Sequence, residues 1–489
     1  MTSSRANTRR TSWWGGPVHV VYTIVVFIVL ASLDNAAIAL IPSMIPQLRE
    51  SYGVGTAALG ALTGAQVLMT AVTAVGWGYL ADQRDRKRLL LWGTLIWSIA
   101  MAMSAFTTSF GVLFALQVVA GIGLGSIAAV GFSVVSDFVA PKRRGLAMSF
   151  WGLSQGIGTL IGSLLASQTG AVNSRAPFLI IAVSGFSFSI LFLLAFDPPR
   201  GFSEPELADL YADGETYDYD IDPSQLHELA DVRTNRWLVL QGLTAQIAYG
   251  SLIWVPLLYQ EKVIAEGYSQ ATGQQVGGLF AAMFSIGALF SILAGHIGDR
   301  WQHRNLSGRA YVSAIGILGA IPFFLIFFWI PLRGLEVTEG ASTLTFLGEV
   351  LSSIATNPWV AAAFLSAIVA LALTSADSPN WFALISDVNV PEHRGTVFGV
   401  GYLVNGVGRA TGAGLTTVTA QVLNRSIPAP YNLAVGLSLF QVFFLPTGWC
   451  YWKASKTCPA DITDVRSTLR NRANNPSPPF KGDSRTTQE

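Results

Sequence analysis

Three ionisable residues, Asp34, Asp377 and Arg409, lie within otherwise apolar segments of the sequence. A charge at the middle of a membrane helix costs about 2.5 to 3.5 kcal/mol, so a charge that is present there normally faces a cavity or a partner. Asp34 can bind and release a proton, whereas Arg409 keeps its charge and is suited to holding an anion or a carboxylate. These three residues are therefore candidates for ion coupling and for binding a charged solute, with Asp34 the preferred coupling site.

Each of the three residues also has another interpretation. We expect Asp34 and Arg409 at similar depth, slightly outside the midplane, where they could form a structural ion pair or compete for one proton or one anionic group. Asp34 could instead lie at a helix end. Asp377 precedes Pro379, and a proline can kink a membrane helix by removing a backbone hydrogen bond. Asp377 is therefore either part of an inner gate or a helix-capping and packing residue.

Neutral polar and aromatic side chains within the apolar segments could shape a substrate site around these charges. Interhelical hydrogen bonds alone explain many such residues in membrane proteins, so each is a candidate for either role. Their aromatic members favour an amphipathic or aromatic solute over a sugar. The candidates are Asn35, Gln117, Gln155, Gln241, Gln246, Tyr249, Trp254 and Asn405.

The composition shows what kind of elements must position these residues. Of the 489 residues, 51% are hydrophobic and 12% are charged, whereas an average soluble chain has about 25% charged residues. About twelve apolar runs are long enough to cross a hydrocarbon core of roughly 30 Å. The sequence therefore predicts an all-α polytopic membrane protein with twelve transmembrane helices in two pseudo-symmetric six-helix bundles.

A segment rich in Asp, Glu and Pro separates the two bundles. Such a composition favours a solvated linker; the alternative is a docking or regulatory segment with a short helix near residues 226–232. We expect the chain after Lys453 to be disordered. The predicted division is an N-terminal tail at 1–17, a first bundle at 18–196, the linker at 197–236, a second bundle at 237–452 and a C-terminal tail at 453–489.

The two halves repeat one another at a fixed spacing of 387 − 137 = 250 residues. Duplicated six-helix halves are typical of secondary transporters that bind their substrate near the midplane between the repeats. Thr159 is the counterpart of Arg409, so this cation belongs to one half only, which favours a ligand-binding role for it. The repeated residues are Ser136, Asp137, Pro141, Arg144, Gly145, Gly156, Gly158 and Gly162, which recur as Ser386, Asp387, Pro391, Arg394, Gly395, Gly406, Gly408 and Gly412.

A short charged hinge, residues 78–88, joins two apolar segments of the first half. A looser copy at residues 295–304 follows at a spacing of 299 − 82 = 217. Asp82 ends a predicted helix, where the helix dipole is unfavourable for a carboxylate unless donors or cations lie nearby. We therefore interpret Asp82 as a latch; charges that only set the membrane topology are the alternative.

The hinge resembles the signature of the major facilitator superfamily, Gly-x-Leu-Ala-Asp-Arg-x-Gly-Arg-Lys/Arg-Lys/Arg. In that family the hinge carboxylate helps to lock the cytoplasmic side shut. The resemblance assigns this role to Asp82 with Arg86 and Arg144 and, by the repeat, to Asp299 with Arg394. The matching residues are Gly78, Leu80, Ala81, Asp82, Arg86, Lys87 and Arg88, while Gln83 and Asp85 depart from the signature.

A narrower likeness is to the Spinster-like branch, which moves lysolipids and sphingolipid-type amphiphiles. It rests on the run Gly-Tyr-Leu-Ala-Asp, on Asp34 in the first helix and on a Gly-x-Gly fourth helix. Asn35, Gln117 and Leu124 stand where that branch has Arg, Arg and Glu.

We predict an alternating-access secondary transporter of a small organic, amphipathic solute, coupled to protons, with sodium as the alternative ion and a lysolipid or organic anion as alternative substrates. Basic residues collect in the loops on one side of the predicted spans, which places both termini and the linker in the cytoplasm of a cell-membrane protein. A functional monomer is expected. The rival interpretation is a transporter-like sensor or scaffold that acts through the acidic linker.

Other function classes find little support. A net charge of +1 argues against a nucleic-acid partner. Two cysteines cannot form a disulfide framework, and the five histidines have no ligand spacing with Cys or carboxylates, so we expect no metal site and no cofactor. A phosphate-binding Gly-x-x-x-x-Gly-Lys-Ser/Thr loop is absent from the sequence, which argues against direct ATP drive. No nucleophile, base and orienting group occur at a readable spacing, so an enzyme is not expected.

Overall fold

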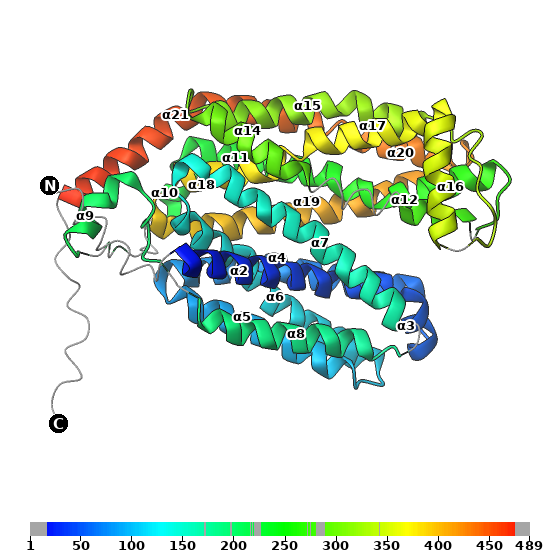
Figure 1. Cartoon of the computed structure of the whole chain (residues 1–489), viewed down its shortest axis with the longest axis horizontal. Coiled ribbons are helices and arrows are strands. Elements are labelled where there is room, and N and C mark those ends of the chain that lie inside the picture. The colour runs from blue at the N-terminus through cyan, green and yellow to red at the C-terminus, as the bar shows by residue number, and fades with distance from the viewer. Residues whose placement is uncertain are drawn as a thin grey trace.

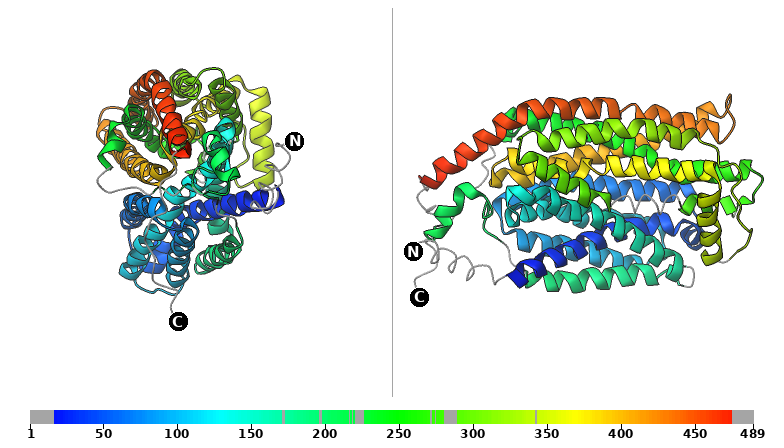
Figure 2. Two further views of the ribbon diagram at one scale, coloured as in Figure 1. Left: turned by 90° about the vertical axis from the view of Figure 1, so that its left-hand side faces the viewer. Right: turned by 45° about the horizontal axis from the view of Figure 1, so that its top comes forward.

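The computed structural model describes residues 17–170, 173–195, 198–215, 217, 219, 226–270, 272–273, 275–279, 289–341 and 343–474. The described secondary structure is helical, and the long helices form two bundles that lie side by side with their axes nearly parallel (Figure 1). Figure 2, in its left view along the bundles, shows the N-terminal and C-terminal helices as two separate groups.

The N-terminal bundle contains six long helices and one short helix. The short helix α3 (Ile45–Tyr52) follows the first span and ends at Gly53, which has a positive φ of 63°. The long helices are α2 (Pro17–Ser43), α4 (Thr56–Gln83), α5 (Arg86–Ser104), α6 (Phe110–Phe138), α7 (Arg144–Gly170) and α8 (Ala176–Leu193).

The C-terminal bundle repeats this order with more interruptions. Three of its spans are single helices: α14 (Phe290–Gln302), α15 (Gly308–Trp329) and α19 (Arg394–Leu423). The short helix α16 (Thr343–Thr356) lies across one end. The interrupted spans are α11 (Arg233–Ser251), η4 (Leu252–Trp254) and α12 (Val255–Ala265); α17 (Pro358–Thr374) and α18 (Asp377–Val388); and α20 (Tyr431–Gln441) and α21 (Phe444–Asn474).

These elements make twelve spans, six in each bundle, as the sequence predicts. Within the described ranges, eight helical segments are long and apolar enough to cross a membrane by length and composition alone. The other four spans, α5, α7, α14 and α19, are shorter or richer in glycine and polar residues.

Glycines allow the closest helix contacts of each bundle. A Cβ at Gly158 of α7 would lie 2.2 Å from the Ser32 carbonyl oxygen of α2, and a Cβ at Gly408 of α19 would lie 2.6 Å from the Leu243 carbonyl oxygen of α11. Gly158 and Gly408 are repeat counterparts, so Ser32 and Leu243 are counterparts too, at a spacing of 243 − 32 = 211. The two bundles are therefore alike in packing as well as in sequence.

The segments outside the bundles pack against one another. In the linker, η2 (Pro205–Leu207), α9 (Ala208–Ala212) and α10 (Leu226–Asp231) are helical, the last where a short helix was an alternative expectation. Disorder after Lys453 is wrong as far as Asn474, because α21 continues to that residue, as the right view of Figure 2 shows. Its Leu469 is buried in a small cluster with Leu207 and Tyr217 of the linker, which accounts for the order.

Candidate functional site

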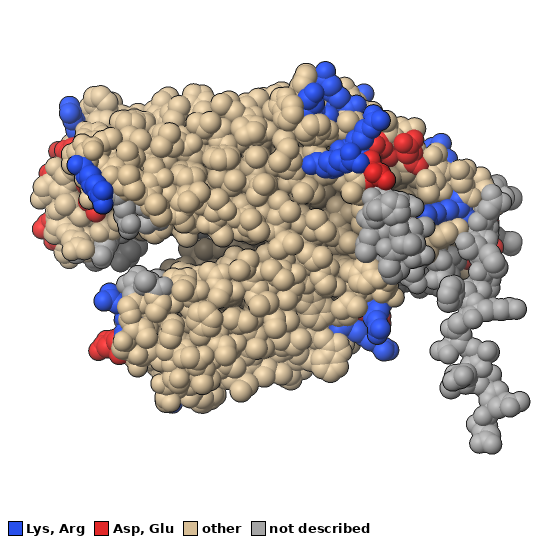
Figure 3. All heavy atoms as spheres, turned by 180° about the vertical axis from the view of Figure 1, so that it is seen from behind, with Lys and Arg blue, Asp and Glu red and all other residues tan. Residues whose placement is uncertain are grey.

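The two bundles meet tightly at one end and separate at the other. We call the end where α4 ends and α19 begins the closed end, and the end that carries α3 and α16 the open end. Figure 3 shows a cleft between the bundles at the open end, which narrows toward the middle of the molecule.

Two carboxylates at the closed end bind the first turn of a helix in the opposite bundle. Asp82 Oδ1 accepts a hydrogen bond from the Gly395 amide at 2.9 Å, and Oδ2 accepts from the Thr396 amide at 2.6 Å and its hydroxyl at 2.7 Å. Asp299 accepts likewise from the amides of Gly145 at 2.8 Å and Leu146 at 2.9 Å. Free amides and the positive end of the helix dipole make a helix N-terminus a favourable place for an anion.

The expected arginine partners of these two carboxylates bind elsewhere. Within the described ranges, Asp82 accepts hydrogen bonds from the start of α19 and from no arginine, while Asp299 pairs with Arg309 at 2.7 Å. Arg86 and Arg144 therefore make no contact with Asp82, and Arg394 makes none with Asp299, among the described residues. The backbone amides already satisfy the carboxylates.

The arginines instead pair with the aspartates of the repeat. Arg144 binds Asp387 at 3.0 Å, and its counterpart Arg394 binds Asp137, the counterpart of Asp387, at 3.2 Å. Arg86 also binds Asp137, within its own bundle. The two cross-bundle pairs thus exchange equivalent residues between the halves, and all four of their side chains are buried.

Glu204 of the linker joins these two pairs. Its carboxylate binds Arg144, and it binds Arg394 at 2.5 Å. Burial alone would raise the pKa of Glu204, but the guanidinium groups of Arg144 and Arg394 outweigh it and hold the pKa at about 2. Sequence reasoning missed Glu204, because the acidic, proline-rich segment around it indicates a solvated linker.

An aromatic layer lies next to the ionic contacts, one to two helical turns closer to the middle. Phe132 of α6 stacks on Phe382 of α18, with ring centroids 3.7 Å apart and planes at 15°. The two are repeat counterparts, since 382 − 132 = 250, so the repeat spacing itself relates them. The rings of Trp151, Phe398 and Tyr402 pack around Phe132 at centroid distances of 4.3, 5.3 and 6.2 Å.

Residues of α19 lead from this layer into the cleft. Tyr402 and Arg409 are seven residues apart, about two turns, and therefore share a face of the helix. Arg409 is exposed although it lies in the middle of a 30-residue helix. Asn405 lies between them and is partly buried, as is Gln155 of α7. Tyr402 lies within electrostatic range of both Arg409 and Asp34.

Asp34 itself is enclosed in the N-terminal bundle and is only 3% exposed. In the part of the chain that the structure describes, neither of its carboxylate oxygens accepts a hydrogen bond of good geometry, although the Trp97 indole lies nearby. No ion pair between Asp34 and Arg409 occurs among these residues. The neighbouring Asn35 donates to the Ala31 carbonyl at 2.8 Å and packs against Gly158.

Several predicted substrate residues make contacts inside a bundle. Gln117 is fully buried, donates to Ser104 at 2.9 Å and accepts from Gln66 at 3.1 Å. Tyr249 donates to the Thr374 carbonyl at 3.3 Å, and Trp254 donates to the Ala413 carbonyl at 2.8 Å.

The remaining candidates lie in the C-terminal bundle or at the closed end. Asp377 accepts from Gln241 at 2.8 Å and from Tyr451 at 2.5 Å, so neutral donors surround it. Gln246 packs beside Gly408, and Gly78 lets the end of α4 approach Gly395, whose carbonyl oxygen lies 2.2 Å from where a Cβ of Gly78 would be. Among the described residues, no group of three or more His, Cys, Asp or Glu is arranged to hold a metal ion.

Two six-helix bundles around a cleft that is open at one end and latched at the other define a polytopic membrane transporter fold. The chain belongs to the Major Facilitator Superfamily, whose family model matches residues 24–413.

Curated relatives include Spinster proteins. The chain is 26% identical over 387 residues to human Protein spinster homolog 1, covering 71% of this chain and 69% of that protein. It is 26% identical over 291 residues to zebrafish (Danio rerio) Protein spinster homolog 3, and this match spans 57% of the chain and 56% of the relative. A 30% identical match over 178 residues to the class H Tetracycline resistance protein of Pasteurella multocida covers 36% of the chain and 44% of that protein.

Solved structures share the fold. The proton:xylose symporter XylE superposes with a TM-score of 0.66 at 13% identity, over 89% of this chain and 96% of XylE. An inward-facing bacterial homologue of the human lysosomal transporter Spinster superposes with a TM-score of 0.56 at 18% identity, over 91% of this chain and 99% of that one.

Proposed function

We propose that the chain is an alternating-access secondary transporter that carries an amphipathic organic anion and is coupled to protons. The observation that carries the proposal is the asymmetry of its two ends. At the closed end, Asp82 and Asp299 bind the opposite bundle through four backbone amides, while a cleft separates the bundles at the open end. Rocking of one bundle against the other would open the end that is now closed and close the end that is now open, on either side of a central site.

The side chains around the cleft support the substrate class. Arg409 places an exposed cation within the cleft-facing side of α19, and the rings of Phe132, Trp151 and Tyr402 form an apolar floor below it. A solute with one anionic group and an apolar body would use both. The names of two relatives agree with an organic substrate: the Sphingosine-1-phosphate transporter SPNS2 of zebrafish and the Tetracycline resistance protein.

Asp34 is the proposed proton site. A buried carboxylate without a cationic partner is costly in its charged form, so uptake of a proton removes this cost. Rearrangement of α2 against α7 would change the surroundings of Asp34 and let it release the proton. The role therefore rests on burial with the Trp97 indole nearby and no ion pair among the described residues.

The positions of the ends complete the proposal. The closed end carries the linker and the extension of α21, and we place it in the cytoplasm of a cell-membrane protein that acts as a monomer. Residues 18–196 and 237–452 are the two moving bundles, and residues 197–236 form the connection between them.

Transport into proteoliposomes with an imposed pH gradient tests the proposal, with sphingosine-1-phosphate and tetracycline as the probes. We expect uptake of an amphipathic probe that collapses when the gradient is dissipated. Asp34→Asn should abolish the response to the gradient, whereas Asp209→Asn, the same change in an exposed linker residue, should leave it intact. Absence of flux under pH and sodium gradients, together with binding of the linker to a partner, would favour a sensor instead.

A further inference from the structure

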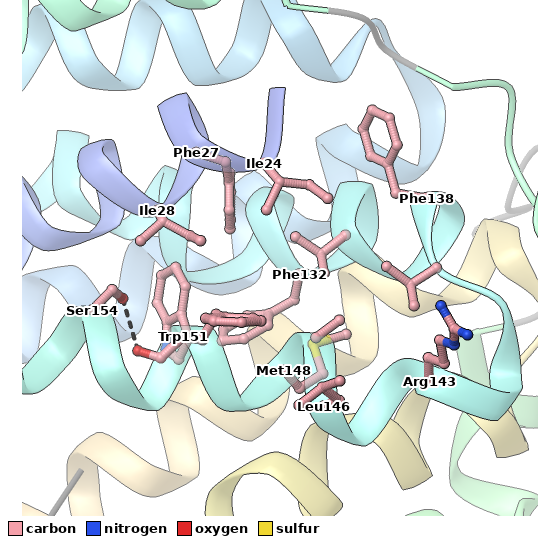
Figure 4. A pocket seen from close by; sticks show the side chains of 14 residues that line it. Ile24, Phe27, Ile28, Phe132, Phe138, Arg143, Leu146, Met148, Trp151 and Ser154 are labelled. Atoms are coloured by element: carbon pink, nitrogen blue, oxygen red, sulfur yellow. Dashed lines mark hydrogen bonds between the residues drawn. The ribbon is translucent and has the colours of Figure 1, made fainter. Parts of the chain in front are cut away.

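A pocket of about 170 Å³ lies outside the cleft, between α2, α6 and α7 near the closed end. Figure 4 shows Ile24, Phe27 and Ile28 of α2 opposite Met148 and Trp151 of α7, with Phe132 of α6 beside them. Its walls are almost entirely carbon. On the adjoining turns of α2, Val21 is 59% exposed and Val25 is 50% exposed, as is usual for side chains that face lipid.

At the corresponding place in the C-terminal bundle, two polar side chains replace two apolar ones. The counterparts of Ile24 and Val139, which line the pocket, are Asn235 and Asn389, from 24 + 211 and 139 + 250. These two amides donate to each other at 2.7 and 2.9 Å and hold α11 against the end of α18. In the N-terminal bundle, Ile24 and Val139 stand at these two positions and cannot form such a hydrogen-bonded bridge.

A second difference between the halves exchanges a tryptophan and a glycine, because Trp151 of α7 corresponds to Gly401 of α19, which packs against Trp381. Gly131 of α6 corresponds to Trp381 of α18, since 381 − 131 = 250. The Trp381 indole is buried and donates to the Leu238 carbonyl at 3.0 Å. The side chains that line the pocket are therefore particular to the N-terminal bundle.

Arg143 lies at one end of the pocket and Ser154 near the other (Figure 4). Arg143 is exposed, and within the described ranges no carboxylate pairs with it, whereas Arg144 beside it is buried in ion pairs. Arg143 directly precedes α7, and Ser154 follows eleven positions later, about 16 Å at 1.5 Å per residue. This length is close to one leaflet of a hydrocarbon core of roughly 30 Å.

We propose that this pocket binds an acyl chain of an anionic glycerophospholipid from the leaflet at the closed end, with the lipid phosphate on Arg143. The apolar walls match the chain, the unpaired guanidinium matches the phosphate, and the length of the pocket matches one leaflet. Binding itself does not depend on the proposed transport function.

Occupancy would act on the closed end through shared side chains. Phe132 and Trp151 line the pocket and also belong to the aromatic layer, where Phe132 stacks on Phe382 of the other bundle. An acyl chain packed against these two rings holds them in the position that the stack requires. The lipid therefore stabilises the conformation in which this end is closed.

Delipidated full-length protein in detergent provides the test, with phosphatidylglycerol and phosphatidylcholine of identical chains as the probes. Native mass spectrometry counts bound lipids, and thermal unfolding reports stabilisation. We expect wild type to bind phosphatidylglycerol more tightly and to gain thermal stability from it. Arg143→Gln should weaken phosphatidylglycerol binding roughly five- to tenfold, since one basic residue near the surface contributes about that much, and should remove the preference over phosphatidylcholine.

Ala147→Phe places a ring in the pocket and should remove one bound lipid of either kind. Arg304→Gln, a change of another exposed arginine at the closed end, is the matched control and should bind lipid as wild type does. Equal binding of both lipids by wild type, or unchanged phosphatidylglycerol binding in Arg143→Gln, would overturn the proposal. Because Arg143 is exposed, its variant decides the question even where Ala147→Phe fails to fold.

Discussion

Replacing Glu204 by Gln is expected to open the closed end. Glu204 binds Arg144 of one bundle and Arg394 of the other, and its pKa is lowered from 4.5 to about 2. A shift of this size corresponds to roughly 3 kcal/mol at 1.36 kcal/mol per unit. A neutral amide loses most of that contribution and leaves the two arginines with one carboxylate each. The ratio of closed to open molecules should therefore fall by roughly 100-fold.

The distance between the bundles at the closed end measures this ratio. Spin labels at Arg84→Cys and Arg304→Cys report it by double electron–electron resonance, because both residues are exposed and lie in different bundles. The native Cys450 and Cys458 are buried, so labelling is directed to the introduced pair. Wild type should give a short distance, and Glu204→Gln should add a longer one as a major population.

Acid should have the same effect on wild type. Because the arginines lower the pKa of Glu204, its contribution is complete above pH 4.5 and is lost as the pH falls from 4.5 towards about 2. Glu215→Gln changes an exposed linker glutamate and should leave the distances as they are. A Glu204→Gln protein that unfolds like wild type and keeps the short distance would refute the reasoning.

Three further changes test other parts of the molecule. Asp82→Asn turns an amide NH2 towards the donors of Gly395 and should lengthen the same distance, since one charge-assisted acceptor is worth about 1.5 to 3 kcal/mol. Arg409→Ala should raise the KM for an anionic probe about tenfold or more while kcat changes little, and Arg409→Lys should restore part of the affinity, as flux assays can show. Arg472→Gln removes a contact with Glu392 and Tyr217 and should speed tryptic cleavage of the linker.

The sequence predicts the bundles well because span length and the 250-residue repeat are properties of the chain itself. It also places Asp82 and Asp299 at the closed end. The sequence could not predict the hydrogen-bond partners of these two carboxylates, because the backbone amides at a helix start have no side-chain signature. The arginines grouped with Asp82 and Asp299 consequently contact Asp137 and Asp387 instead.

Residues missed altogether depend on contacts far along the chain. Glu204 lies in an acidic, proline-rich segment, and only Arg144 and Arg394, 60 and 190 residues away, make it a buried group. The polar sequence of α21 after Lys453 is ordered because Leu469 meets linker residues more than 200 positions earlier. Composition within a window carries no information about such partners. Gln117 shows the reverse case, in which a plausible ligand residue is satisfied inside its own bundle.

The exchange of ion pairs between the halves has a consequence for how the gene can change. Arg144 meets Asp387 and Arg394 meets Asp137, so neither half holds the cross-bundle partner of its own arginine. A charge change in one half removes one partner of a buried charge in the other, where Asp137 keeps Arg86, Asp387 keeps Arg309 and both arginines keep Glu204. After duplication the two copies could diverge in their loops and in the pocket beside α2. At these four positions, the residue in one half limits which substitutions the other half tolerates.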